Sequence, residues 1–166
     1  MTRTIVDQHA FRDTLGRFAT GIAVICTVED GEPHGFACQS FTALSLSPPQ
    51  VLFCPARTSR AWAVIARTRS FAVSVLAGDQ RPVSGVFGSK AERKFDAVEW
   101  FPAPGSGNPV LAGSLAWVDA EITSVADGGD HEVVIGRVLR VGVADADPGP
   151  LLYYRGRYAG ALVSDP

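Results

Sequence analysis

The residues best suited to binding chemistry lie in the run from Gly35 to Gln50, which packs small and hydroxyl residues closely. Residues such as Gly35, Ala37 and Ser40 let a flat ligand approach the backbone, while hydroxyl and amide groups offer it hydrogen bonds. The alternative, which this run favours when it is taken alone, is a strand whose small residues pack against a helix.

A second candidate site is the segment from Cys54 to Arg60, where an expected strand ends and an expected helix begins. It holds two hydroxyl groups, on Thr58 and Ser59, and two guanidinium groups, on Arg57 and Arg60. Free N–H groups at a helix N-terminus and arginine side chains together favour binding of a phosphate. An ordinary capped helix with solvated arginines is an equal alternative, because capping hydroxyls are common.

Two further polar groups stand later in the chain. Three cationic side chains follow a glycine between Phe87 and Phe95 and would complement a pyrophosphate, although such a run is more often the solvated face of a helix. In Gly129-Asp130-His131, a histidine beside an aspartate at the start of a strand is a titratable donor. A structural or merely exposed turn histidine is the alternative.

Short strands joined by turns must position these groups. β-branched residues predict a strand at 23–28 that returns at 34–40 through the Asp30-Gly31 turn. Further strands are expected at 51–54, 71–76, 118–123 and 131–143, and a last hairpin at 151–154 and 157–159. Many short strands and few helices favour a closed or nearly closed antiparallel barrel over a parallel sheet.

Helices are expected at 7–18 with Asp7 as the N-cap, at 59–67 capped by Thr58 or Ser59, and from Asp79 to Phe87. Pro82 falls in the first turn of the last of these, where proline is tolerated. Residues 102–109 and 145–150 are expected to form turn-rich surface loops.

Composition narrows the class of protein. The 166 residues are 46% hydrophobic and 19% charged, which predicts one packed domain over 1–166 with its core at 10–160. A net charge of −2 without a basic stripe argues against a nucleic-acid partner, and no apolar run is long enough for a membrane span. Residues 1–7 lack the apolar region of a signal peptide, and three cysteines without a CxxC motif suit a reducing cytoplasm.

Several familiar catalytic motifs are missing from the sequence. It has no Rossmann glycine fingerprint, P-loop or nucleophile elbow, and its histidines and cysteines lack the spacing of metal ligands. A nucleophilic Cys38 acting with His131 is a weak alternative, because the sequence does not bring the two together in space.

Taken together, these segments resemble the flavin reductase family, whose members supply reduced flavin to two-component monooxygenases. The likeness spans residues 10–160 and rests on motifs at 18–21, 40–42, 45–49, 71–76, 94–95, 129–131 and 150–156. Each motif is weak alone, but their common order and spacing are specific. The run from Gly35 to Phe41 is most similar to an actinobacterial branch that serves a hydroxylase of steroid catabolism.

The resemblance implies a mainly β fold, an FMN-binding split β-barrel that is antiparallel and Greek-key-like, with a few short helices, and that forms a homodimer. Carried over by position, the contacts to the isoalloxazine ring would be Ala37, Cys38, Gln39, Ser40 and Phe41. Those to its phosphate or ribityl chain would be Pro55, Ala56, Arg57, Thr58, Ser59 and Arg60. Those to the flavin tail would be Ser89, Lys90, Lys94 and Phe95. His131 would line the nicotinamide site as the candidate catalytic residue, with Tyr158 in its wall.

The expected reaction is reduction of free FMN or FAD by NADH or NADPH, with a hydride passing from nicotinamide C4 to flavin N5. The protein would position and shield the two rings, and His131 would orient the nicotinamide carboxamide without acting as an obligatory acid or base. Reduced flavin would then leave for a separate oxygenase component. The alternatives are a non-catalytic flavin-binding protein on the same fold, an oxidase of the pyridoxamine-phosphate type and a carrier of a small apolar ligand.

Overall fold

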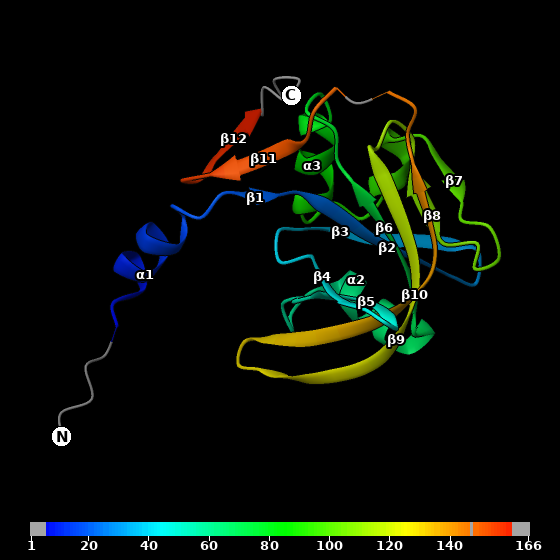
Figure 1. The fold of residues 1–166 in the computed structure, drawn as a ribbon, viewed down its shortest axis with the longest axis horizontal. Helices are drawn as coiled ribbons and strands as arrows, with labels where there is room; N and C mark the ends of the chain where they lie inside the picture. Colours follow the sequence, from blue (N-terminus) through cyan, green and yellow to red (C-terminus); the bar gives the residue numbers. More distant parts are fainter. Residues whose placement is uncertain (1–5, 147, 161–166) are drawn as a thin grey trace.

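An antiparallel sheet of seven strands organises this computed structural model, which describes residues 6–146 and 148–160. Its strands lie in the order β3-β2-β6-β9-β10-β5-β4 (Figure 1). Their bounds are β2 Ala23–Glu29, β3 Glu32–Cys38, β4 Thr42–Leu46, β5 Pro49–Phe53, β6 Ser70–Val75, β9 Ala116–Gly128 and β10 His131–Val143. The described residues leave out 1–5, 147 and 161–166. The expectations for the N-terminal segment 1–7 and for the loop at 145–150 therefore fall partly outside them.

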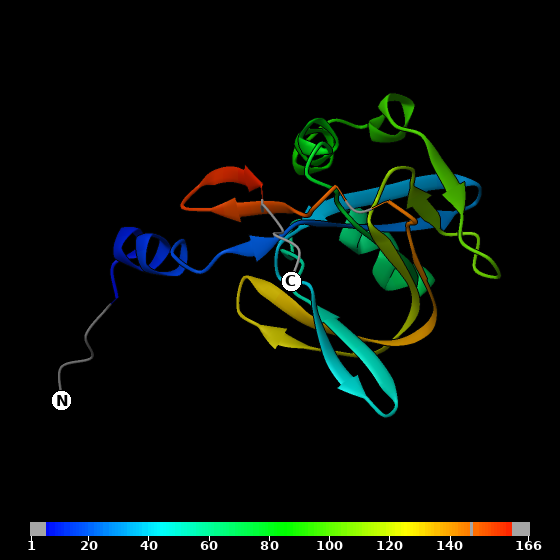
Figure 2. The same ribbon diagram turned by 45° about the horizontal axis from the view of Figure 1, so that its top comes forward.

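Smaller elements flank this sheet. A three-stranded sheet has the order β1-β11-β12, and β7 pairs with β8. Their bounds are β1 Thr20–Gly21, β7 Trp100–Pro102, β8 Pro109–Leu111, β11 Leu151–Tyr154 and β12 Arg157–Gly160. The helices are α1 Gln8–Leu15, α2 Arg60–Thr68, α3 Arg81–Gly88 and the 3-10 helix η1 Lys94–Ala97. Figures 1 and 2 both show α1 standing apart from the sheets. Within the described ranges, no helix has the length and apolar character needed to cross a membrane.

Local sequence signals explain several of these elements. The turn between β2 and β3 has positive φ angles at Asp30 (52°) and Gly31 (84°), the conformation that favours Asp-Gly in hairpins. Ser59 caps α2, since its side chain accepts a hydrogen bond from the backbone N–H of Trp62. The N-cap of α3 is Gln80 and not Asp79 as expected, and α1 ends at Leu15, three residues before its expected end.

The fold is mainly β and antiparallel, as predicted, but the described residues do not form a closed barrel. Strands β3 and β4 are the two edges of the seven-stranded sheet and do not pair with each other. Helix α2 packs against β2, β3 and β6, on the strands nearest the β3 edge. The sheet is therefore open along one side, and expected closure by hydrogen bonding is not seen.

Aromatic side chains fill the main core between α2 and the sheet. The Phe53 ring is fully buried, with its centroid 5.0 Å from that of Phe71 and 6.0 Å from that of Trp62. Ile25 and Ile65 complete this cluster from β2 and α2. Because β5 and α2 both contribute to it, the core fixes the segment 54–59 that joins them.

The segment 102–109 turns the chain as its prolines and glycines predict, with residues 102, 104 and 105 exposed, but it does not lie on the surface throughout. Ala103 and Asn108 are buried, with 2% and 1% of their surface exposed. Asn108 accepts and donates hydrogen bonds deep in the structure, and the backbone N–H of Ala103 donates to its carbonyl oxygen at 2.8 Å. The expectation of a surface position is wrong at residues 103, 108 and 109, because tertiary partners outweigh the local turn signal.

Candidate functional site

Two adjoining cavities occupy the region between β3, α2 and α3. The central cavity, of about 470 Å³, is lined by Ile22, Phe36, Ala37, Cys38, Gln39, Ser40, Cys54, Pro55, Ala56, Ser59, Ser84, Gly88, His131, Tyr153 and Tyr158. The cationic groove, of about 740 Å³, runs past residues 33–37, 58–61, Val64, 87–92, Lys94 and Phe95. Phe36, Ala37, Ser59 and Gly88 belong to both linings, so the two spaces meet there.

Two chain segments form the polar side of the central cavity. One is the end of β3 and the residues after it, 37–40, and the other is the segment that follows β5. Ser40 joins them, since its Oγ accepts a hydrogen bond from the backbone N–H of Cys54 at 2.8 Å and lies 3.2 Å from the Sγ of Cys38. Burial raises the pKa of the Cys38 thiol, which disfavours the thiolate form that a nucleophile requires.

His131 enters the central cavity from the start of β10. Its backbone forms an isolated β-bridge with Ala56, which lines the same cavity. Its Nδ1 lies 2.7 Å from the Oδ1 of Asp130, and this hydrogen bond lowers the pKa of the Asp130 carboxyl. The contact fixes the imidazole ring through Nδ1, so Nε2 is the nitrogen that would meet a ligand.

Tyr158 forms the opposite wall and is held by three side chains. Its Oη lies 3.1 Å from the Oγ of Ser84, and the guanidinium carbon of Arg81 lies 5.1 Å from its ring centroid. The Tyr153 ring meets it edge to face with centroids 5.4 Å apart. This wall is therefore rigid and aromatic, as stacking against a flat ligand requires.

The cationic groove gathers positive charge beside the N-terminus of α2. The Nζ of Lys94 donates hydrogen bonds to the carbonyl oxygens of Phe87 at 3.0 Å and Gly35 at 3.4 Å. Burial, and after it the charge of Arg60, lowers the pKa of Lys94. Arg60 in turn donates to the carbonyl of Lys90 at 2.6 Å and pairs with Glu92. A bound phosphate would relieve the repulsion between these cations.

Fifteen of the predicted site residues line at least one of the two cavities. Cys38, Gln39, Ser40, Pro55, Ala56, His131 and Tyr158 line the central cavity, Thr58, Arg60, Ser89, Lys90, Lys94 and Phe95 line the groove, and Ala37 and Ser59 line both. Phe41 and Arg57 line neither. Phe41 packs against the main core, and the guanidinium of Arg57 is engaged by the β9–β10 hairpin. Arg57, which was expected at the phosphate or ribityl chain, therefore has its guanidinium group engaged outside both linings.

Sequence reasoning missed several lining residues. Gly88 lies at the junction of the cavities. It directly precedes Ser89, and the predicted contact at Ser89 was the signal that could have pointed to it. Tyr153 stands inside the motif at 150–156 without being singled out, and Ser84 gave no signal at all. A Cβ added at Gly88 would meet no heavy atom within 4 Å and would enter open space. The junction therefore has the room, and its surroundings the donors and cations, that a flavin with its phosphate chain needs.

Comparisons with known proteins show the family to which the chain is related. The flavin reductase like domain family matches residues 15–162. The reductase subunit HsaB of a flavin-dependent monooxygenase from Rhodococcus jostii is 50% identical over 93% of this chain and 78% of its own length. The structure of a nitrilotriacetate monooxygenase component B homologue from Mycobacterium thermoresistibile matches with a TM-score of 0.92 and 47% identity, over 96% of this chain and 90% of that one. The NADH:FAD oxidoreductase SgcE6 of Streptomyces globisporus, in complex with NAD and FAD fragments, matches with a TM-score of 0.89 and 32% identity over 96% of each chain. The chain therefore belongs to the family of the flavin reductase like domain.

Proposed function

We propose that this chain reduces free FMN or FAD with NADH or NADPH and releases the reduced flavin to a separate oxygenase component. The observation that carries the proposal is the junction of two cavities in a member of this family. One holds His131 and Tyr158, and the other gathers cations at a helix N-terminus. The similarity to a monooxygenase reductase subunit supports an oxygenase as the partner. The expected likeness to an actinobacterial reductase is confirmed by the 50% identity to HsaB of Rhodococcus jostii, while a role of the oxygenase in steroid catabolism stays a prediction.

The flavin, when bound, supplies the redox chemistry by accepting a hydride. The chain's own residues bind and orient the flavin and the nucleotide. The backbone at 37–40 offers hydrogen bonds along one edge of the ring site, and the apolar side chains of Ile22 and Phe36 exclude water from it. His131, oriented through Asp130, presents Nε2 to the carboxamide of a nicotinamide stacked within the central cavity.

The phosphate chain of the flavin belongs, in this proposal, at the N-terminus of α2. Arg60→Gln should raise the KM for FMN about tenfold with little change in kcat, because a charged hydrogen bond to phosphate is lost. Arg67→Gln is the matched control: it lies on the same helix, pairs with Glu29 on the surface and lines neither cavity. Steady-state kinetics at varied FMN would measure the difference. Equal KM values for the two variants would remove Arg60 from the site.

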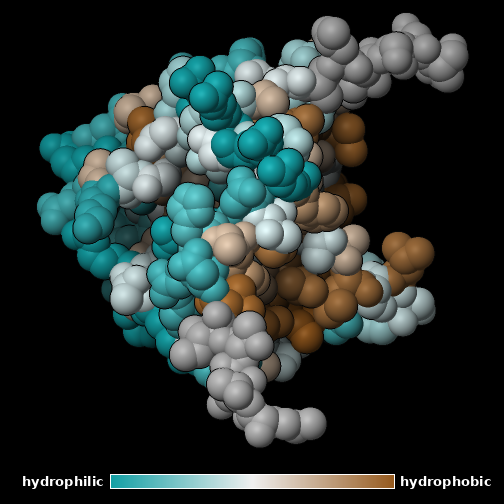
Figure 3. Space-filling view, turned by 90° about the vertical axis from the view of Figure 1, so that its left-hand side faces the viewer, coloured by the Kyte–Doolittle hydropathy of each residue, from teal (hydrophilic) through white to brown (hydrophobic). Residues whose placement is uncertain are grey.

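We also propose that the chain forms a homodimer and that its open sheet is the split barrel of the family. None of the described residues of α1 is buried, and Phe11, Leu15, Phe18 and Leu46 are more than half exposed. Figure 3, seen from the side of α1, has apolar side chains gathered on one part of the face. Light scattering after size exclusion should give twice the chain mass of 17.6 kDa. A mass of one chain would contradict the dimer.

The three free cysteines support a cytoplasmic location.

Release of reduced flavin requires modest affinity, since a substrate must exchange between turnovers. Equilibrium dialysis of the protein against FMN and FAD, with NADH added in a second run, tests this directly. We expect both flavins to exchange freely in the oxidised and reduced forms. Flavin that stays bound through many turnovers would contradict a diffusing product and would favour a flavoprotein that keeps its cofactor.

A further inference from the structure

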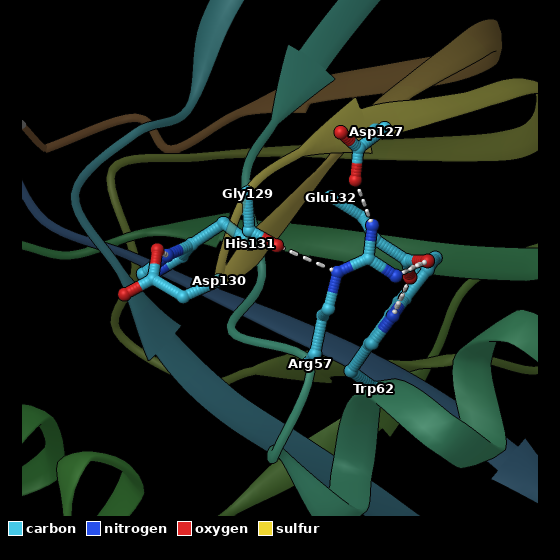
Figure 4. A network of polar contacts seen from close by, with 7 residues as sticks. All are labelled: Arg57, Trp62, Asp127, Gly129, Asp130, His131 and Glu132. Carbon is cyan, nitrogen blue, oxygen red and sulfur yellow. Dashed lines mark hydrogen bonds and ion pairs between the residues drawn. The ribbon is translucent and has the colours of Figure 1, made fainter.

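Arg57 directs all of its side-chain hydrogen bonds to the tip of the β9–β10 hairpin (Figure 4). Its Nε donates to the carbonyl oxygen of Gly129 at 2.9 Å, its Nη1 to the Oε1 of Glu132 at 2.8 Å, and its Nη2 to the Oδ1 of Asp127 at 2.5 Å. These three partners lie on both sides of His131 in the sequence. The guanidinium thus holds the turn before the histidine and the residue after it.

Glu132 and the backbone tie the same two segments together. The Oε2 of Glu132 accepts a hydrogen bond from the Nε1 of the buried Trp62 at 2.5 Å, while its Oε1 accepts from Arg57. The backbone N–H of Arg57 donates to the carbonyl of Asp130 at 3.1 Å, and that of Glu132 donates to Pro55 at 3.0 Å. The Pro55-Ala56 wall of the central cavity and the start of β10 are therefore joined by backbone and side-chain hydrogen bonds.

Apart from the Trp62 bond to Glu132 and the backbone contacts with residues 55–57, the tip of the hairpin has little support other than Arg57. The last six residues of β9 are exposed, and pairing of β10 with β5 begins only at Val134, three residues beyond His131. An exposed hairpin tip with few buried contacts opens and bends at low cost in free energy. Small displacements of a positioned side chain lower the rate or affinity strongly, since orientation is what the site supplies.

We infer that Arg57 is a positioning residue for His131, setting the place of the imidazole in the central cavity, and is not a ligand of the flavin phosphate. This inference rests on the proposed function, in which His131 orients the nicotinamide. It assigns part of the affinity for the pyridine nucleotide to a contact outside the cavity lining. Exposed ion pairs contribute little to stability, so loss of the Arg57 contacts should leave the fold intact.

The test compares the KM values for NADH and for FMN in Arg57→Gln, alone and in a His131→Ala background. We expect Arg57→Gln to raise the KM for NADH about tenfold and to leave the KM for FMN within about twofold, because only the nucleotide wall shifts. In the His131→Ala background the same substitution should have no further effect on the KM for NADH. Arg57→Lys, which keeps the charge but offers one donor group, should fall between the two.

Arg137→Gln is the matched control, since this substitution removes an ion pair with Glu121 between the same two strands. Arg137 lines neither cavity. The substitution should leave both KM values at the wild-type level. A rise in the KM for FMN with Arg57→Gln, or an undiminished effect on NADH without His131, would overturn the inference. So would a His131→Ala variant with an unchanged KM for NADH. Failure of the wild-type protein to reduce flavin at all is a separate result, which refutes the proposed function itself.

Discussion

Gly88→Leu should raise the KM for flavin about 100-fold while the protein stays folded. A side chain placed in space that the bound flavin would occupy weakens binding by up to about 3 kcal/mol. Gly88 lines both the central cavity and the cationic groove, at the point where they meet. A Cβ there meets no heavy atom within 4 Å, so a larger side chain starts into open space in the free protein. The cost therefore falls on the ligand, which must cross this junction. Steady-state kinetics and a thermal melt of the same sample would measure both.

Gly85→Leu provides the control for this substitution. Gly85 lies on the same helix, α3, also has no heavy atom within 4 Å of an added Cβ, and lines neither cavity. It should leave the KM for flavin unchanged. Equal effects of the two leucines would show that the change acts through the helix and not through the junction, and would place the flavin elsewhere.

Asn108→Leu should lower the free energy of unfolding by about 3 kcal/mol, since it leaves several buried polar groups without partners. The Nδ2 of Asn108 donates to the Oγ of Ser70 at 2.7 Å and to the Oδ1 of Asp119 at 3.4 Å. Its Oδ1 accepts from the Oγ1 of Thr27 and from the backbone N–H of Val28, both at 3.3 Å. Asp119 is fully buried, and its Oδ2 has no hydrogen-bond partner among the described residues. The carboxylate therefore depends on the donors to its Oδ1, which include Asn108.

Urea unfolding followed by circular dichroism would measure this loss. Thr123→Ala is a suitable control, because it removes one exposed side-chain hydrogen bond to the carbonyl of Ile135. It should change the free energy of unfolding by no more than about 0.5 kcal/mol. An Asn108 variant as stable as that control would mean that the buried network adds nothing to the fold.

Elements with a strong local signal could be predicted from the sequence. The Asp30-Gly31 hairpin, the last hairpin around Gly156 and helix α2 all occur as expected, because turn chemistry and capping act within a few residues. Short strands such as β1 and β8 were missed, since two or three residues carry no periodic pattern. Their strand conformation depends on partners far along the chain.

The same distinction applies to the candidate site. The residues at 37–40 and 58–60 could be found because each run is contiguous and chemically distinct, and the structure brings them to adjoining cavities. The surroundings of Arg57 could not be found, because its partners lie 70 or more residues away. A guanidinium group next to capping hydroxyls resembles a phosphate ligand in sequence, and only the folded hairpin reveals its other partners.

The most direct test of the whole account is anaerobic stopped-flow mixing of the protein and excess free FMN or FAD with NADH or NADPH. Loss of the oxidised-flavin absorbance would be followed over time. We expect each protein molecule to reduce many flavins with at least one nucleotide, and the four combinations would rank both substrates. Flavin that binds but stays oxidised with both nucleotides would contradict the account and would leave a flavin-binding protein without reductase activity.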